Sequence, residues 1–489
     1  MPKYYTGRRT LRIAERSENI TRDNILRIMQ EIYPTIKINH TETKELYAYY
    51  LGIQPILNKE RPTESDDYKN NIVVENHAFK LVNFKTSYLI SDGFKYSQSD
   101  DKRTDDVTML NKYYTDEDKL TKDNELAKSM YIAGHGYRFT RPTADKNADF
   151  EGESPFNIIN LDTDKAFVVY STDVDGATAL SGYVAQTKQA ALTGNTDEYT
   201  FTIYTNERVF TIVTNTNDFV GSAKVTEEVN ILGKNPIVEY ALNEARIGVI
   251  DVAYSALNSI NIITSNQIDD IVDFVNSILV LYNVNIDKKK VLDLREIGAM
   301  QVDDKNPQAQ AKVEYVSNQL SHSQINELYD RIVKTVYDIV GVPIASGQVT
   351  SGGDTGEARK LGNGYESADL VIKLEEAMFI SSERRCLKLQ LYICKSFKDC
   401  KINDLFASEI QINPTRHNLD NILSKVQALA QLNSMDFPEE ASLILVGLGA
   451  NPHELATEWI SKKEKNKYTL NSANNSEVEL ENKNSAEEI

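Results

Sequence analysis

The sequence predicts a mixed α+β protein that is largely helical and is divided into several domains. Apolar residues recur at helical spacing over most of the chain. Between about Gly136 and Val229 the spacing changes to two, which is typical of strands. A length of 489 residues allows about three domains. A hydrophobic content of 41% and a charged content of 26% are those of a folded chain.

Net charge and cysteine content narrow the class of protein. The formal net charge is −18, which argues against tight binding of nucleic acid, because such binding requires neutralised phosphates. It does not exclude a protein through which nucleic acid passes. The three cysteines, Cys386, Cys394 and Cys400, form no CxxC motif and no even set, so we expect a reducing compartment. No signal peptide is evident, and no apolar run is long enough to cross a bilayer, so we expect an intracellular protein without membrane contact.

The first half of the chain is expected to contain helices followed by strands. Helical spacing covers 21–57 and 110–130, and a helix that enters a turn is predicted over 71–96. Phe167–Tyr170 has the composition of a short buried strand. Alternating segments on both sides of Asn206–Glu207 predict a hairpin.

Two amphipathic helices, predicted at 249–277 and 322–341, bracket a small mixed module at 278–321. The apolar stripe of the first helix starts at Ile250 and, with a skip near Thr264, is expected to continue through Ile271 to Ile278. The stripe is narrow and nearly heptad-like, so this helix should pack beside others of its kind. The opposite side of the second helix is charged, with Glu327, Asp330, Arg331, Lys334 and Asp338.

A glycine-rich loop, Val342–Thr355, follows the second helix. Beyond it, a helical pattern over 356–400 is interrupted by glycines at 362 and 364, which predict a kink. Residues 401–465 have a candidate strand and short helices. The polar, acidic tail Asn466–Ile489 is expected to be disordered.

Several chemical roles are open to these residues. The Ser351–Gly356 loop precedes a helix and could hold a phosphate, but it lacks a GK[ST] ending and a preceding strand. A phosphate- or nucleotide-handling enzyme is therefore the less favoured alternative. Arg331 and Lys334 could meet DNA phosphates, or could pair with Glu327 and Asp330 four residues earlier, and both possibilities stay open. No metal-ligand spacing or catalytic triad is evident, so no cofactor is expected.

Five short elements, in the same order along the chain, resemble the portal proteins of tailed bacteriophages. The resemblance is to the family typical of long-tailed phages of Gram-positive bacteria and covers roughly 40–465. One departure is the passage Ser351–Ala358, which is longer than the compact SGxA of the family. The elements that carry the resemblance are Leu46–Gly52, Asn71–Tyr96, Asn235–Tyr240, Val340–Pro343 and Ser351–Ala358.

The resemblance implies a ring of about twelve copies at one capsid vertex, through which double-stranded DNA is packaged and ejected. It implies no enzymatic activity. The implied partners are terminase, a head-completion or adaptor protein, and the major capsid and scaffolding proteins. The implied location is the virion, with the host cytoplasm during assembly. Another head or baseplate component is an alternative.

The resemblance also assigns regions and residues. The regions are wing (1–248), stem helices (249–277 and 322–341), clip (278–321), tunnel loop (342–355), kinked wing helix (356–400), crown (401–465) and tail (466–489). The charged residues of the second stem helix would line the DNA channel. The tunnel loop would present Ser346, Gly347, Gln348, Val349, Thr350, Ser351, Gly352 and Gly353. Packing between copies would involve Ile250, Leu257, Ile260, Ile332 and Val336.

Overall fold

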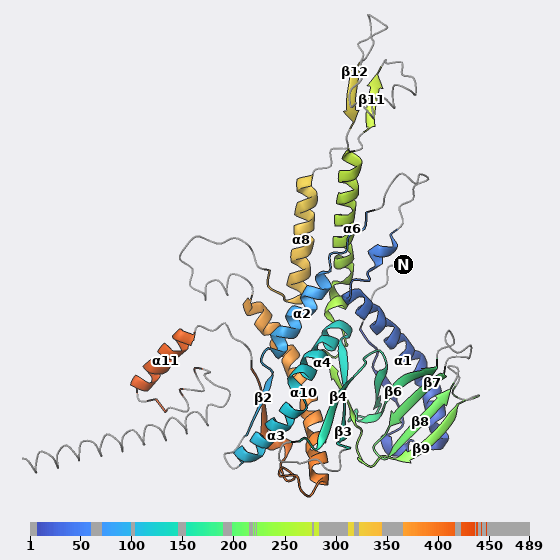
Figure 1. Cartoon of the computed structure of the whole chain (residues 1–489), viewed down its shortest axis with the longest axis vertical. Coiled ribbons are helices and arrows are strands. Elements are labelled where there is room, and N and C mark those ends of the chain that lie inside the picture. The colour runs from blue at the N-terminus through green and yellow to red at the C-terminus, as the bar shows by residue number, and fades with distance from the viewer. Residues whose placement is uncertain are drawn as a thin grey trace, which may run out of the picture. The chain divides into compact units, whose positions relative to one another are not determined.

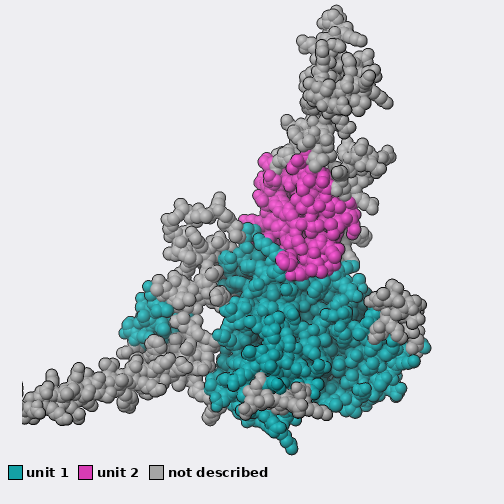
Figure 2. Space-filling view, viewed as in Figure 1, with its two compact units in different colours: residues 1–47, 80–252, 341–489 teal, residues 48–79, 253–340 magenta. Residues whose placement is uncertain are grey.

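The computed structural model describes most of the chain and divides it into two compact units. Unit 1 comprises Met1–Tyr47, Lys80–Val252 and Gly341–Ile489, and unit 2 comprises Ala48–Phe79 and Ala253–Val340 (Figure 2). The described residues are 7–59, 71–98, 103–144, 153–188, 198–214, 223–275, 278–282, 312–316, 322–344, 365–415 and 422–435, with a few isolated positions.

A six-stranded sheet forms one part of unit 1, in the order β1-β5-β6-β7-β8-β9 (Figure 1). Only β1 is parallel to its neighbour, β5, and the other strands pair antiparallel. Helix α1 (Arg22–Tyr50) covers this sheet with Ile25, Ile28 and Ile32, which share one buried core with the sheet residues. The strands are β1 (Leu11–Ile13), β5 (Ala166–Ser171), β6 (Thr178–Lys188), β7 (Glu198–Tyr204), β8 (Arg208–Thr214) and β9 (Lys224–Val229).

The second part of unit 1 is built around the long helix α10 (Tyr365–Ser396). A three-stranded antiparallel sheet, β10-β3-β4, contacts this helix. The antiparallel pair β13–β2 and the helices α3 and α4 complete this part. Its remaining elements are α2 (His77–Ile90), β2 (Phe94–Gln98), α3 (Thr104–Asp116), α4 (Lys119–Ala133), β3 (His135–Pro142), β4 (Phe156–Leu161), β10 (Ile237–Ala241), β13 (Ile410–Pro414) and α11 (Ile422–Ser434).

Buried charges fix α10 against this part of unit 1. The Glu383 carboxylate is fully buried and lies 3.2 Å from both Arg138 Nη1 and Lys119 Nζ. It also accepts hydrogen bonds from the hydroxyls of Tyr96 (2.8 Å) and Tyr240 (2.6 Å). Burial alone would favour the neutral acid, but the two cations outweigh it and hold the pKa of Glu383 below its usual value.

This carboxylate belongs to a polar stripe that recurs every seventh residue along α10. The Tyr88 hydroxyl donates to Asp369 (2.5 Å), and the Tyr114 hydroxyl donates to Gln390 (2.8 Å). Each contact is made at one position along the helix, so the stripe sets the register of α10. Its members are Asp369, Glu376, Glu383 and Gln390.

Unit 2 contains most of helix α6 (Val249–Val275), helix α8 (His322–Val340) and the two-stranded antiparallel sheet of β11 (Ile278–Tyr282) and β12 (Lys312–Val316). The short 3-10 helix at Pro55–Asn58 and an extended segment at 71–76 also belong to it.

Most helices and the hairpin predicted from the sequence are present in the structure. The predicted helix over 110–130 is instead two helices, α3 and α4, because Asp118 adopts a left-handed conformation with φ of 48°. The predicted helix 356–400 is described from Tyr365 onward, and both glycines of the expected kink lie outside the described residues. Most of the expected clip and the whole acidic tail also lie outside them.

Candidate functional site

Three side chains on one face of α6 hold the extended segment 71–75 by its backbone. Two extended residues span about 6.8 Å and four helical residues rise about 6 Å, so every second N–H group meets every fourth helical side chain. This match of spacing creates a ladder of three hydrogen bonds. They join the amides of Asn71, Val73 and Glu75 to Asp269 Oδ1 (2.8 Å), Ser265 Oγ (3.0 Å) and Asn261 Oδ1 (2.8 Å), respectively.

The acceptor side chains of this ladder are buried, with Asn261 and Ser265 fully covered and Asp269 2% exposed. Their remaining polar groups have partners within unit 2. Asn261 donates to Gln54 Oε1 (2.5 Å), and Lys59 Nζ lies 3.4 Å from Asp269 Oδ2. A buried carboxylate with an ammonium partner and two N–H donors is stabilised in its charged form. The ladder therefore replaces apolar packing in this half of α6.

Glu75 extends the ladder to the second helix. Its carboxylate accepts hydrogen bonds from Thr264 on α6 (2.6 Å) and from Tyr329 on α8 (2.5 Å). His77 Nε2 lies 3.1 Å from the same carboxylate, and His77 Nδ1 lies 3.1 Å from the Tyr337 hydroxyl. Partial burial opposes the charge, but these donors outweigh it and hold the pKa of Glu75 below its usual value.

A direct link also joins the two helices. Gln267 Nε2 on α6 donates to Asn326 Oδ1 on α8 (3.0 Å). The two helices are therefore connected by polar contacts. One of these is direct, and the others run through Glu75 at the end of the extended segment.

The charged side chains that the sequence placed on the second helix are all exposed on α8. They are Glu327, Asp330, Arg331, Lys334 and Asp338. The opposite face of α8 is buried, with Val336 and Tyr337 at 0% and 2% exposure. Within the part of the chain that the structure describes, neither Arg331 nor Lys334 forms an ion pair, so both cations face solvent in the single chain.

The apolar residues assigned to ring packing are mostly covered within one chain. Ile250, Leu257, Ile260 and Val336 are at most 2% exposed, and Ile332 is half-buried. The expected continuation of the α6 stripe through Ile271 is wrong. That side chain is 52% exposed, because the buried face of this half of α6 is the polar ladder. That these five residues contact a neighbouring copy in a ring stays a prediction.

The glycine-rich loop is described only at its start. Gly341 ends α8 with φ of 71°, and Val342 is buried. Most of the remaining loop lies outside the described residues, including every position from Ser346 to Gly353. The phosphate-binding alternative at Ser351–Gly356 lies outside them as well.

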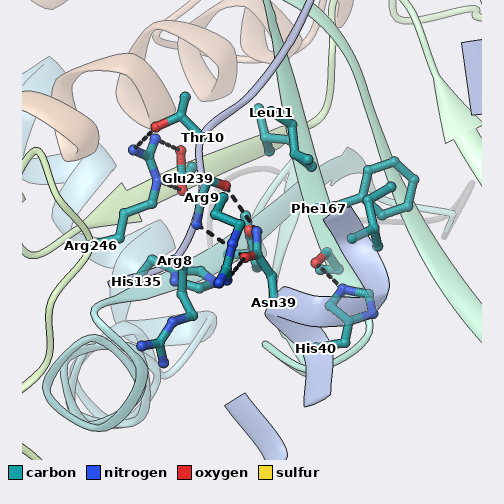
Figure 3. A pocket seen from close by; sticks show the side chains of 14 residues that line it. Arg8, Arg9, Thr10, Leu11, Asn39, His40, His135, Phe167, Glu239 and Arg246 are labelled. Carbon is teal, nitrogen blue, oxygen red and sulfur yellow. Dashed lines mark hydrogen bonds and ion pairs between the residues drawn. The ribbon is translucent and has the colours of Figure 1, made fainter. Parts of the chain in front are cut away.

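A pocket in unit 1 is lined by several charged side chains (Figure 3). Arg246 pairs with Glu239 (2.7 Å), and Arg8 pairs with Asp251 (2.7 Å). Burial lowers the pKa of His135 to about 3, so this side chain is neutral at pH 7. Because these arginines already pair with carboxylates, the pocket has the character of a structural polar core rather than an anion site.

Residues 32–467 match the family described as phage portal protein, SPP1 Gp6-like. The chain belongs to this portal protein family. No protein in the curated collection matches it. Among solved structures, the fold is similar to that of a chain in the neck of an empty gene transfer agent particle, computed with C6 symmetry, at 12% identity and a TM-score of 0.43. The aligned part covers 76% of this chain and 90% of that one. A chain in the virion of a native gene transfer agent particle is 10% identical, with a TM-score of 0.42. The aligned part covers 83% of this chain and 99% of that one.

The family match confirms the resemblance drawn from the five short elements, and the chain is a bacteriophage portal protein. Portal proteins are structural rather than enzymatic. Among the described residues, no cluster of acidic, histidine or cysteine side chains could hold a metal ion. Among the same residues, no helix is long and apolar enough to cross a membrane.

Two features of this portal protein were missed from the sequence. One is the ladder between α6 and the segment 71–75, and the other is the buried charge around Glu383. Polar residues at four-residue spacing on α6, and at seven-residue spacing on α10, were the available signals.

Proposed function

We propose that copies of this chain assemble into a closed ring of about twelve at the capsid vertex, and that double-stranded DNA passes through its centre during packaging and ejection. The α6 and α8 pair forms the stem of each copy. The charged face of α8 lines the channel, and the loop 342–355 projects toward the DNA. The ring is a virion component that assembles in the host cytoplasm.

The observation that carries this proposal is the exposed charged face of α8 in a member of the portal family. Three acidic residues and two basic residues give this face a net charge of −1 per copy (−3 + 2). A channel wall with mixed charge and a small negative excess repels phosphates weakly and offers only scattered cations. DNA can therefore pass without being held.

The other regions complete this assignment. The module at 278–321, which includes the β11–β12 pair, serves as the clip that docks terminase and, later, a head-completion or adaptor protein. The wing (1–248) faces the major capsid and scaffolding proteins. The chain performs no catalysis and needs no cofactor, so the energy for translocation comes from the terminase.

Charge reversal on α8 tests the channel assignment. The variant Arg331→Glu/Lys334→Glu raises the negative charge of the face by four per copy, and we expect intact rings that package DNA more slowly, most clearly at low salt. The control is Lys112→Glu, at an exposed position on α3. Ring images and packaged DNA length are measured together. If the α8 variant forms normal rings and packages DNA as the control does at every salt concentration, α8 does not line the channel.

A further inference from the structure

Helix α8 carries an apolar stripe that is only partly covered within unit 2. Leu328 is 39% exposed and Ile339 is 57% exposed. The stripe recurs at alternating steps of three and four residues, so its members lie along one side of the helix. This side differs from the buried face at Val336 and Tyr337 and from the charged face described above. The members of the α8 stripe, apolar except for one threonine, are Ile325, Leu328, Ile332, Thr335 and Ile339.

A second exposed apolar surface of unit 2 begins just after α1. Leu51 and Ile53 are 69% and 65% exposed, and Leu57, on the short 3-10 helix, is 45% exposed. Ile72, in the extended segment, is 37% exposed. We call these four residues the turn patch. The sequence from 48 to 58 contains no charged residue. Exposed apolar side chains gathered in this way are typical of an interaction surface.

The α8 stripe and the turn patch belong to different sides of α6. Gln267 contacts α8, whereas Ser265 and Asp269, two positions to either side of it, contact the segment 71–75. Two helical residues turn through about 200°, so α8 and this segment flank α6 on nearly opposite sides. Figure 1 shows the same arrangement, with α8 on one side of α6 and the short blue helix Pro55–Asn58 on the other. One copy therefore does not cover its stripe with its own patch.

The two surfaces lie at the same level along α6. Lys59, just beyond the turn patch, donates to Asn266 Oδ1 (2.7 Å). Asn326, in the same helical turn as Leu328, accepts from Gln267 (3.0 Å). The two α6 residues are neighbours, so their levels differ by about 1.5 Å. A rotation about an axis parallel to α6 moves no atom along that axis. Copies related by such a rotation can therefore bring the stripe of one against the patch of the next.

We propose that the α8 stripe of one copy packs against the turn patch of the neighbouring copy. This inference rests on the ring of the proposed function and assigns the surfaces that close it. A contact between two different surfaces is heterologous, and repetition of such a contact builds a ring when the rotation closes. Of the residues that the sequence assigned to ring packing, Ile332 belongs to this contact, and the other four are covered within one chain. The charged face of α8 stays exposed, because it lies on another side of the helix.

Area and charge both favour a second copy as the occupant of each surface. From Ile325 to Ile339 the stripe is about 21 Å long, and a helix is about 10 Å wide, so the contact covers on the order of 200 Å². A stable pair of proteins typically buries about 800 Å² per partner, so one such contact is weak, whereas each copy in a ring makes it on two sides. Every copy has a formal net charge of −18, so copies repel each other. The stripe and the patch carry no charged side chain and are suited to a close approach.

Cross-linking between copies tests this contact. The full-length variant Leu57→Cys/Leu328→Cys, treated with a short bismaleimide, should give a ladder of covalent oligomers up to the size of the ring. Either single variant should give monomers, and a mixture of the two should stop at linked pairs. The controls are the parent chain, whose three cysteines are buried, and Leu57→Cys/Lys334→Cys, which moves one thiol to the charged face of α8. Linked pairs from Leu328→Cys alone would show a two-fold contact and would overturn the proposal.

Charge placed in the stripe provides a second test. Leu328→Asp/Ile339→Asp changes two exposed side chains, so we expect a folded monomer by circular dichroism and no rings in images. Arg331→Glu/Lys334→Glu adds more negative charge on the other face of α8 and should keep the rings. Rings from the aspartate variant, or parent-like rings that give no ladder, would overturn the contact and leave the proposed function standing. A parent chain that forms no rings would overturn the ring itself and this contact with it. If the aspartate variant is unfolded, the cross-linked ladder decides.

Discussion

The Glu75 carboxylate accepts a 2.5 Å hydrogen bond from the Tyr329 hydroxyl, although 254 positions separate the two residues. This contact joins the extended segment 71–75 to helix α8. The same carboxylate accepts from Thr264 on α6, so one ionised group connects three parts of unit 2. A charged acceptor strengthens both hydrogen bonds relative to a neutral one. The pairing of α6 with α8 thus depends on a polar junction as well as on its apolar faces.

Removal of Asp269 should destabilise this assembly of segments. The variant Asp269→Ala leaves the Asn71 amide and Lys59 without their shared acceptor, and hydrogen bonds to a charged group each contribute about 1.5–3 kcal/mol. We expect the free energy of unfolding to fall by about 2–4 kcal/mol, measured by urea titration. The control is the adjacent Asp270→Ala, since Asp270 forms no hydrogen bond or ion pair within the described part of the chain. Equal effects of the two variants would show that the ladder contributes nothing.

Acid should weaken the junction at Glu75. Because the pKa of Glu75 is lowered in the folded chain, its ionised form favours folding. This contribution is complete above the ordinary carboxyl pKa of about 4.3 and is lost as the pH falls through the lowered value. We expect the difference in melting temperature between wild type and Glu75→Gln to be constant near neutral pH and to shrink below about pH 4.

The comparison for this prediction is Glu228→Gln, at an exposed position on β9. The melting temperature of that variant should differ little from that of wild type at any pH. A gap between wild type and Glu75→Gln that does not change with pH would mean that the ionised carboxylate is not what stabilises the junction.

Removing the buried carboxylate of Glu383 on α10 should lower the free energy of unfolding more than the loss of Asp269 does. Among the described residues, Glu383→Ala leaves Arg138 and Lys119 with Asp123 as their one close acidic partner, and breaking a buried ion pair typically costs about 3–5 kcal/mol. We expect a loss of this size in denaturant unfolding, with aggregation if the chain cannot tolerate it. Lys388→Ala, at an exposed position of the same helix, should have little effect. A loss below about 1 kcal/mol for Glu383→Ala would contradict the anchoring role of this group.

The loop prediction tests the proposed DNA path. Gln348→Lys with Thr350→Lys would place about two dozen cations in a ring of about twelve copies, so packaging should slow in a manner that high salt relieves. Stiffening by Gly352→Pro with Gly353→Pro should leave rings intact but impair packaging, because the glycines allow conformations that other residues resist. Packaged DNA length and rate at two salt concentrations are the measurements, with Gln348→Glu/Thr350→Glu as the charge control. Parental behaviour of both lysine and proline variants would place the loop away from the DNA.

The sequence by itself determined the local elements of this portal protein. Helices α6 and α8, and the β7–β8 hairpin, follow from the spacing of apolar residues, because neighbours three, four or two positions apart share a face. The exposure of Arg331 and Lys334 follows from the same spacing. The family resemblance was also available at this level, because it rests on short motifs in a fixed order.

Tertiary structure alone decided which polar residues are buried together. Asn261, Ser265 and Asp269 would suit a solvated helix face, and nothing local reveals that the segment 71–75, almost 200 residues earlier, supplies their donors. The same holds for Glu383 and Arg138, whose charges are stable inside the protein because each lies beside groups of opposite charge, including the other. A polar side chain carries the same chemistry whether exposed or buried, and its partner, brought from elsewhere in the chain, determines which state is stable.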